Sequence, residues 1–158
     1  MKVGEHRKFQ FQRKDVTMMS ASALTCLQTE FRNNRTSQAL ADAQSLQDLQ
    51  NARAAESIAS HLSGDDHKII VSAMRAAATA GAGQVQMIRF PSAACTDLGR
   101  RINSAQPDWG STLQGRPADI YRFWEKELRP QGFRIVAQVL EFPKGKPGDV
   151  GLSVVWSE

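Results

Sequence analysis

Three basic side chains recur along one expected helix at a spacing that suits contact with DNA. Arg122, Lys126 and Arg129 stand at positions i, i+4 and i+7 of residues 117–129, so they share one face of a helix. An arginine guanidinium donates to two acceptors on a guanine edge, and a lysine contacts phosphate as a point charge. The three therefore form a candidate DNA-contacting stripe. The alternative is a solvated face, in which Glu125 pairs with Arg129 one turn away.

Two further lysines, Lys144 and Lys146, lie in the turn-rich stretch "PKGKPGD" (143–149). A phosphate-binding P-loop needs a Gly-Lys-Ser/Thr ending and a helix after it. Here a β-branched run follows, and the prolines remove amide donors. The stretch therefore predicts a hairpin connection, whose lysines would reach the DNA backbone as a wing.

Residues that could support catalysis or bind a metal are few. Cys95 stands in the first turn of an expected helix, where the helix dipole can lower a thiol pKa. It shares the inner side of that helix with Leu98 and Ile102, which favours a buried, inert thiol. His61 and His67 are six residues apart, which is not a metal-ligand spacing. Since the chain also lacks hydrolase, zincin and dinucleotide-binding motifs, we expect no enzyme, no metal and no cofactor.

The net charge of +4 is concentrated at one end of the sequence. Residues 1–15 hold five basic and two acidic residues, against 15 basic and 14 acidic in the remainder. A basic tail favours polyanions, although many such tails only keep a terminus solvated. If Met18 or Met19 is the true start, the tail is not part of the protein.

The composition predicts a cytoplasmic protein without a membrane span. Two cysteines are too few for a disulfide framework. No stretch approaches the roughly 20 apolar residues of a membrane helix. The segment "VTMMSASALTCL" (16–27) has the length of a signal-peptide apolar region, so export stays open as an alternative.

Residues 1–62 are expected to form a basic tail followed by a helical or flexible extension. Residues 28–60 are rich in Gln, Ala and Ser and contain no Pro or Gly. Their apolar positions from Leu46 to Ile58 recur every three residues, so they drift around a helix instead of forming a seam.

Residues 63–158 predict one compact α+β domain. Ser63 is suited to cap a helix, and Gly81 to end it. Pro117 suits the first turn of a later helix. The expected elements, in order, are a helix 65–80, a strand 84–90, a helix 93–104, a helix 117–129, and strands 133–142 and 150–156.

This order of elements resembles the winged helix-turn-helix superfamily. The segment "TDLGRRIN" (96–103) is similar to the second helix of that family. The segment "RPADIYRFWEKELRPQGFRI" (116–135) is similar to its recognition helix, leading through a glycine into the first wing strand. The resemblance covers residues 65–156. It implies that the helix 117–129 reads DNA and that the loop 143–149 is a wing.

The leading hypothesis is thus a small DNA-binding protein, such as a transcriptional regulator or a mobile-element accessory. The alternative is a non-enzymatic α+β protein–protein interaction module. That module would bind a protein partner, or a second copy of itself, through the edge of the hairpin or through residues 28–60.

Overall fold

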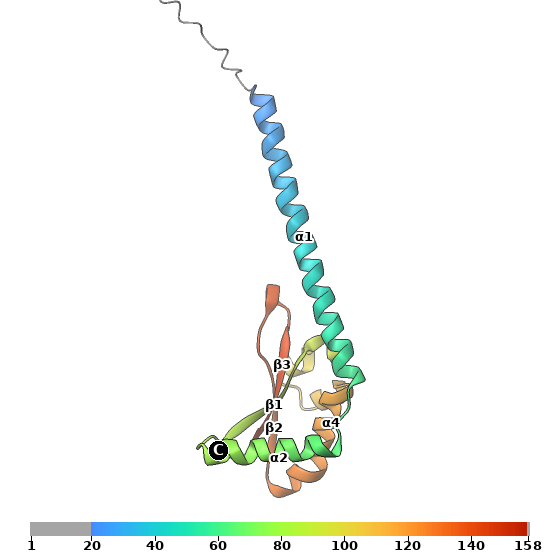
Figure 1. Ribbon diagram of the computed structural model, residues 1–158, viewed down its shortest axis with the longest axis vertical. Helices are drawn as coiled ribbons and strands as arrows, with labels where there is room; N and C mark the ends of the chain where they lie inside the picture. Colours follow the sequence, from blue (N-terminus) through green and yellow to red (C-terminus); the bar gives the residue numbers. More distant parts are fainter. Residues whose placement is uncertain (1–19, 158) are drawn as a thin grey trace, which may run out of the picture. The chain divides into compact units, whose positions relative to one another are not determined.

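A computed structural model describes residues 20–157, and the predicted basic tail with its alternative starts at Met18 and Met19 lies outside them. The chain divides into two compact units, and the boundary in the sequence lies between Ala43 and Gln44. Figure 1 shows the elements of each unit.

The extension is helical. Helix α1 runs from Ala21 to Ala59 and buries a single residue, Ala54. The absence of Pro and Gly along this segment permits an uninterrupted helix. Helical structure was one of the two states expected for residues 28–60.

Helix α2 (Gly64–Thr79) begins as the sequence predicted. The amide of Asp66 donates to the hydroxyl of Ser63, and the Ser63 amide donates to the Asp66 carboxylate in return, which completes a capping box. The amide of Ser63 and the guanidinium of Arg116 hold the pKa of Asp66 down at about 2. Ile70 and Met74 form the buried face of the helix.

The sheet has three antiparallel strands in the order β1-β3-β2. The strands are β1 (Gln84–Pro91), β2 (Arg134–Val139) and β3 (Asp149–Val155). The β2–β3 hairpin confirms the predicted C-terminal pair of strands. Since β3 pairs on both sides, it is the central strand, and Val150, Leu152 and Val154 are fully buried on it.

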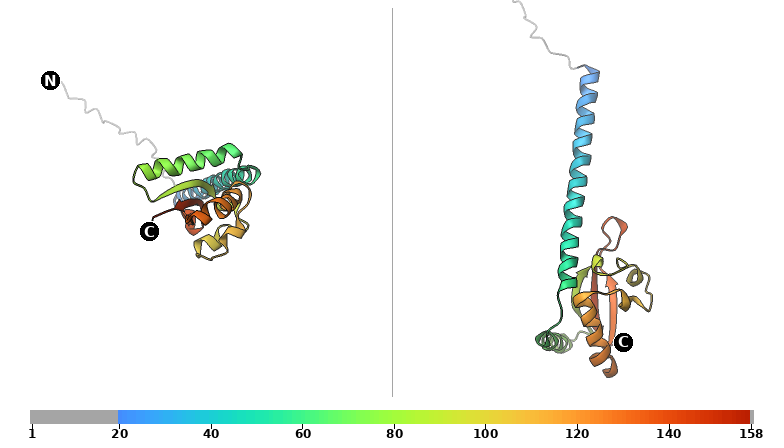
Figure 2. Two further views of the ribbon diagram at one scale, coloured as in Figure 1. Left: turned by 90° about the horizontal axis from the view of Figure 1, so that it is seen from below. Right: turned by 90° about the vertical axis from the view of Figure 1, so that its right-hand side faces the viewer.

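The core lies between one face of this sheet and the helices that cover it (Figure 2). Phe90 from β1 packs there with the three buried side chains of β3. Ile120 and Trp124 from the fourth helix complete the cluster. The architecture is therefore the α+β class predicted from the sequence.

The fourth helical segment contains α4 (Gly115–Phe123), a π-helical turn (Trp124–Leu128) and a 3-10 turn (Arg129–Gln131). It ends at Gly132, which adopts a left-handed φ of 93°. The indole of Trp124 donates to the carbonyl of Phe133 and fixes the start of β2. A helix over 117–129 is thus confirmed, with a π turn that the sequence did not indicate.

The helix predicted over 93–104 is wrong. A 3-10 turn (Ser92–Ala94) is followed by turns and by a four-residue α3 (Arg100–Asn103). The Asp97 carboxylate accepts hydrogen bonds from the amides of Gly99 and Arg101, and Gly99 is left-handed with φ 78°. This local hydrogen bonding competes with a helix and starts a new one at Arg100. A second 3-10 turn, Trp109–Thr112, precedes α4.

Candidate interaction surfaces

The predicted basic stripe is exposed, but two of its three members are paired on their own helix. Arg122 donates to Asp119 at 2.7 Å, and Arg129 lies 3.7 Å from Glu125. Lys126 has no ion pair among the described residues. The π turn also breaks the regular 100° spacing between residues 124 and 128, so the three do not lie on one straight line along the helix.

The Asp119 carboxylate accepts hydrogen bonds from residues of two different segments. It accepts hydrogen bonds from His61 at 2.8 Å and from the Leu62 amide at 3.2 Å, besides that from Arg122. Burial raises the pKa of Asp119, but the His61 and Leu62 hydrogen bonds and the Arg122 charge outweigh it and leave the pKa lowered. This carboxylate is therefore a persistent negative charge beside Arg122, which weakens any attraction to phosphate.

The hairpin lysines are separated from the stripe. A short 3-10 turn (Pro143–Gly145) lies between β2 and β3 and carries Lys144 at φ 52°. Lys144 and Lys146 are exposed and form no ion pair with a described residue. Strand β2 starts beside the end of the fourth helical segment and spans roughly 16 Å before the loop begins. Figure 2 shows the loop and the last turns of that segment at opposite ends of the sheet. The five predicted residues are therefore not brought together on one surface.

The remaining candidates for chemistry were the Cys95 thiol and a metal site. Burial raises the pKa of Cys95 to about 11, so its thiol stays protonated at neutral pH. Cys95 forms an isolated bridge with Leu113, not the first turn of a helix. No group of metal-ligating side chains exists in the part of the chain that the structure describes.

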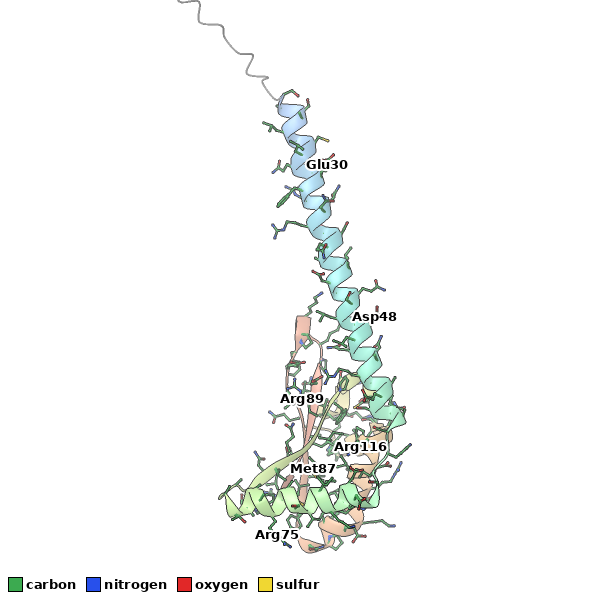
Figure 3. All side chains as sticks on the ribbon, in the orientation of Figure 1. Glu30, Asp48, Arg75, Met87, Arg89 and Arg116 are labelled. Carbon is green, nitrogen blue, oxygen red and sulfur yellow. The ribbon has the colours of Figure 1, made fainter. Side chains whose placement is uncertain are left out.

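A buried carboxylate that the sequence did not reveal ties three distant segments together. Asp149 is only 2% exposed and accepts hydrogen bonds from Arg53 at 3.2 and 3.3 Å and from Arg89 at 2.6 Å. Glu141 adds a 3.5 Å contact to Arg89, which projects from β1 (Figure 3). Burial raises the pKa of Asp149, but both arginines outweigh it and keep the pKa lowered. This cluster holds the end of α1 against the hairpin and leaves no charge free.

The part of α1 before Gln44 presents an apolar row that the sequence analysis missed. Leu24, Leu27 and Phe31 are 53%, 48% and 65% exposed. Their spacing of three and then four residues is that of the a and d positions of a heptad. At 100° per residue they fall within about 60° of one another. We call these three residues the α1 seam. The sequence feature that could have revealed the α1 seam is this alternation of three- and four-residue spacings. It precedes the apolar positions from Leu46 onward, which recur every three residues.

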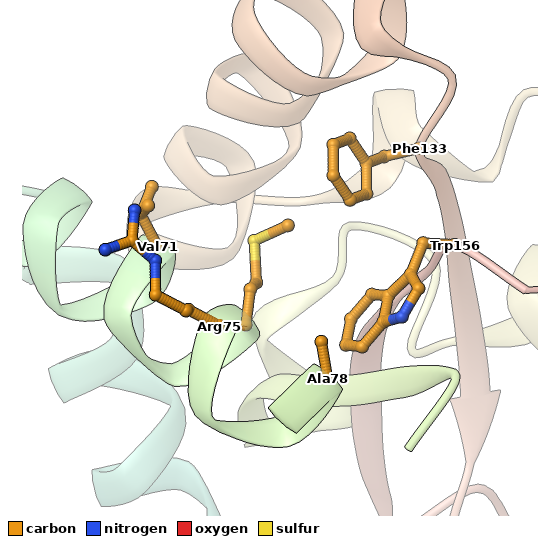
Figure 4. Close-up of a pocket in the computed structure, with 6 residues that line it drawn as sticks. Val71, Arg75, Ala78, Phe133 and Trp156 are labelled. Atoms are coloured by element: carbon orange, nitrogen blue, oxygen red, sulfur yellow. The ribbon is translucent and has the colours of Figure 1, made fainter. Parts of the chain in front are cut away.

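A second apolar surface is a cavity beside α2. Figure 4 shows it with its lining side chains. Its volume is about 300 Å³. It is lined by Val71, Met74, Arg75, Ala78, Phe133 and Trp156.

No helix among residues 20–157 is long and apolar enough to cross a membrane. The chain matches no protein-family model, no curated protein and no solved structure. Its function is therefore inferred from the side chains of these surfaces.

Proposed function

We propose that the protein is a non-enzymatic interaction module that pairs with a second copy of itself through the α1 seam, with the two helices parallel. The observation that carries this proposal is the exposure of the seam. Three large apolar side chains stand on one face of α1, and each is about half exposed or more.

Helices of this kind gain most of their stability in water from packing of an apolar face. The residues of α1 up to Ala43 bury no side chain. Covering the seam would remove apolar surface from water at roughly 25 cal/mol per Å². A partner for the seam would therefore stabilise the helix as well as the complex.

The charges beside the seam favour a second copy of the same chain. If Leu24 is a heptad a position, Glu30 is a g position and Arg35 is the following e position. In a parallel pair of helices the g residue of one chain faces that e residue of the other. Glu30 and Arg35 have opposite charges, and neither forms an ion pair with a described residue. Arg35 already lies 5.9 Å from the Phe31 ring, beside the seam.

The residues that continue the seam favour the parallel, in-register arrangement. The next d and a positions are Asn34 and Gln38. In register, each apolar residue meets its own copy, and Asn34 meets Asn34 of the second chain. An antiparallel pairing that overlaps residues 20–43 completely would set Leu27 and Phe31 against polar side chains, and one centred on Leu27 would not bring Asn34 against its own copy. A polar residue at a seam position is a known means of fixing register.

The test is the molar mass of the full chain, measured by light scattering over a range of concentrations. We expect a monomer–dimer equilibrium for the wild type and a monomer throughout for Leu27→Glu. The matched control is Leu40→Glu, because Leu40 is 67% exposed on the same helix but lies off the seam. A monomeric wild type, or equal effects of the two variants, would rule out the proposal.

The orientation has its own test. A Leu27→Cys variant is made with Cys26→Ser, so that residue 27 carries the exposed thiol of α1. In a parallel pair the two residues at position 27 lie opposite each other and oxidise to a disulfide-linked dimer. Cys95 is buried and does not compete. If light scattering detects a dimer of this variant but an added oxidant does not link its chains by a disulfide, the parallel arrangement is contradicted.

DNA binding is the second candidate. Lys144 and Lys146 favour it, because both stand in the hairpin loop, exposed and free of ion pairs among the described residues. Anisotropy of a labelled mixed-sequence duplex at low salt tests it. A salt-sensitive complex that Lys144→Gln with Lys146→Gln weakens would support DNA binding. Absence of binding at low salt would remove it.

The proposal includes a cytoplasmic location. Both cysteines are free thiols, Cys26 exposed and Cys95 buried. An exposed free thiol suits a reducing compartment.

A further inference from the structure

The cavity beside α2 has the walls of a binding site for an apolar group. The buried Met74 lines it, and the rings of Phe133 and Trp156 meet edge to face with their centroids 6.4 Å apart. Val71 and Ala78, one at each end of the α2 side, are exposed. Nearly all of the lining is carbon, so water in the cavity has few hydrogen-bond partners.

One cation stands at the rim of this apolar cavity. Arg75 lies on α2 between Val71 and Ala78, one turn from each; its side chain extends toward Val71, with the guanidinium on the side away from Phe133 and Trp156 (Figure 4). Arg75 is exposed, and it forms no ion pair or side-chain hydrogen bond with any residue from 20 to 157. It therefore keeps its full capacity to bind an anion in two parallel hydrogen bonds.

We propose that this cavity binds a small carboxylate with an apolar chain, such as a medium-chain fatty acid. The chain lies against Met74, Phe133 and Trp156, and the carboxylate pairs with Arg75. A volume of about 300 Å³ is at the small end of ligand cavities, which suits a single chain of roughly eight to ten carbons. This inference is independent of the pairing of α1.

The combination of walls and charge selects this ligand over others. A neutral alcohol of the same length fills the cavity but leaves Arg75 without a partner. An amine places a second positive charge beside Arg75, and like charges repel. A sugar or a nucleotide has hydroxyl and phosphate groups that these carbon walls cannot satisfy, so its burial is costly.

The test compares decanoate, decanol and decylamine by calorimetry on the full chain, below the concentration at which decanoate forms micelles. We expect decanoate to bind roughly two- to fivefold more tightly than decanol, as is usual for a pair with an exposed cation, and decylamine to bind weakest. In Arg75→Gln the preference for decanoate over decanol disappears. The matched control, Arg100→Gln, keeps it, because Arg100 is also exposed but lies on α3.

A second variant separates the cavity from other apolar surfaces. Ala78→Phe fills the cavity from an exposed position and abolishes binding of all three probes. Leu27→Glu, which removes the α1 seam, leaves decanoate binding unchanged. The proposal is overturned if decanoate does not bind the wild type, if it binds no better than decanol, or if its binding survives Ala78→Phe. It is also overturned if binding is lost in Leu27→Glu, which would place the probe on α1.

Discussion

Ion pairs are frequent in one region of this protein, and none is formed among the described residues of another. In the unit that begins at Gln44, most carboxylates have a cation within hydrogen-bonding distance. Examples are Asp66 with Arg116, Asp108 with Arg101, Asp119 with His61 and Arg122, and Asp149 with Arg53 and Arg89. Along α1 up to Ala43, Glu30, Arg32, Arg35 and Asp42 form no ion pair with a described residue.

Apolar side chains follow the same division. The unit from Gln44 buries Phe90, Leu152 and Val154 completely, although it also exposes side chains such as Leu98 and Phe142, whereas α1 before Gln44 buries no side chain at all. A region whose polar and apolar groups are both satisfied internally is held together by them. A helix that buries no side chain and whose charges have only local contacts along the helix has an apolar face available for another molecule. Substitutions in the first region should therefore change stability, and substitutions in the second should change association.

The largest effect is expected at Asp149. In Asp149→Asn two guanidinium groups lose the carboxylate that they share in a buried position, and removal of one member of such a cluster is strongly destabilising. Because Arg53 and Arg89 are 43% and 49% exposed, water compensates part of the loss. We expect a decrease of about 3 kcal/mol in the free energy of unfolding, measured by urea denaturation.

Glu141→Gln is the control for this variant. Glu141 contacts the same Arg89, but at 3.5 Å and with 48% of its side chain exposed. Exposed ion pairs contribute roughly 0–1 kcal/mol. An equal decrease in the free energy of unfolding in Asp149→Asn and Glu141→Gln would mean that the burial of Asp149 does not determine how much it stabilises the fold.

The sequence predicted the local features of this unit and missed the long-range ones. The Ser63 cap, the hairpin and the helix over 117–129 follow from neighbouring residues, and the structure has all three. The Asp149 cluster joins residues 53, 89 and 149, and no spacing rule links positions so far apart. The failed helix at 93–104 was decided by hydrogen bonds of Asp97 to backbone amides.

In the candidate DNA-contacting stripe, too, local features could be predicted and contacts between distant segments could not. The exposure of Lys126, Lys144 and Lys146 was predictable from their type and position. The pairing of Arg122 with Asp119 also follows from their spacing of three residues on one helix. The hydrogen bonds of His61 and Leu62 to Asp119 do not, because they come from another segment. The α1 seam could have been found from its spacing of three and four residues alone.

A smaller effect is expected at the cap of α2. Ser63→Ala removes the hydroxyl that accepts the Asp66 amide at 3.3 Å, and such a loss costs about 1 kcal/mol. Ser63→Thr keeps a hydroxyl and should recover most of the loss. Urea denaturation of both variants checks this, and an unchanged Ser63→Ala protein would show that the capping box does not stabilise the unit.

Asp66 also gives the cap a dependence on pH. Its pKa falls from 3.8 to about 2 in the folded protein, so the folded state favours the charged carboxylate. Its contribution is complete above about pH 4 and is lost as the pH falls toward 2. Asp66→Asn should therefore lose less stability over this interval than the wild type. Parallel acid titrations of the two proteins would contradict this.

The smallest effect on stability is expected on α1, where the effect on association is largest. Leu27→Glu and Leu40→Glu should each change the unfolding free energy of the α+β unit by less than about 0.5 kcal/mol, since both residues are exposed before Gln44.

An unpacked helix is only marginally stable in water. The circular dichroism at 222 nm of the wild type should therefore increase with protein concentration as the seam is covered. Leu40→Glu should keep this increase, and Leu27→Glu should show the dilute value at every concentration. A wild-type signal that is independent of concentration would mean that α1 is stable without a partner, and the contrast between the two regions would then carry no information about association.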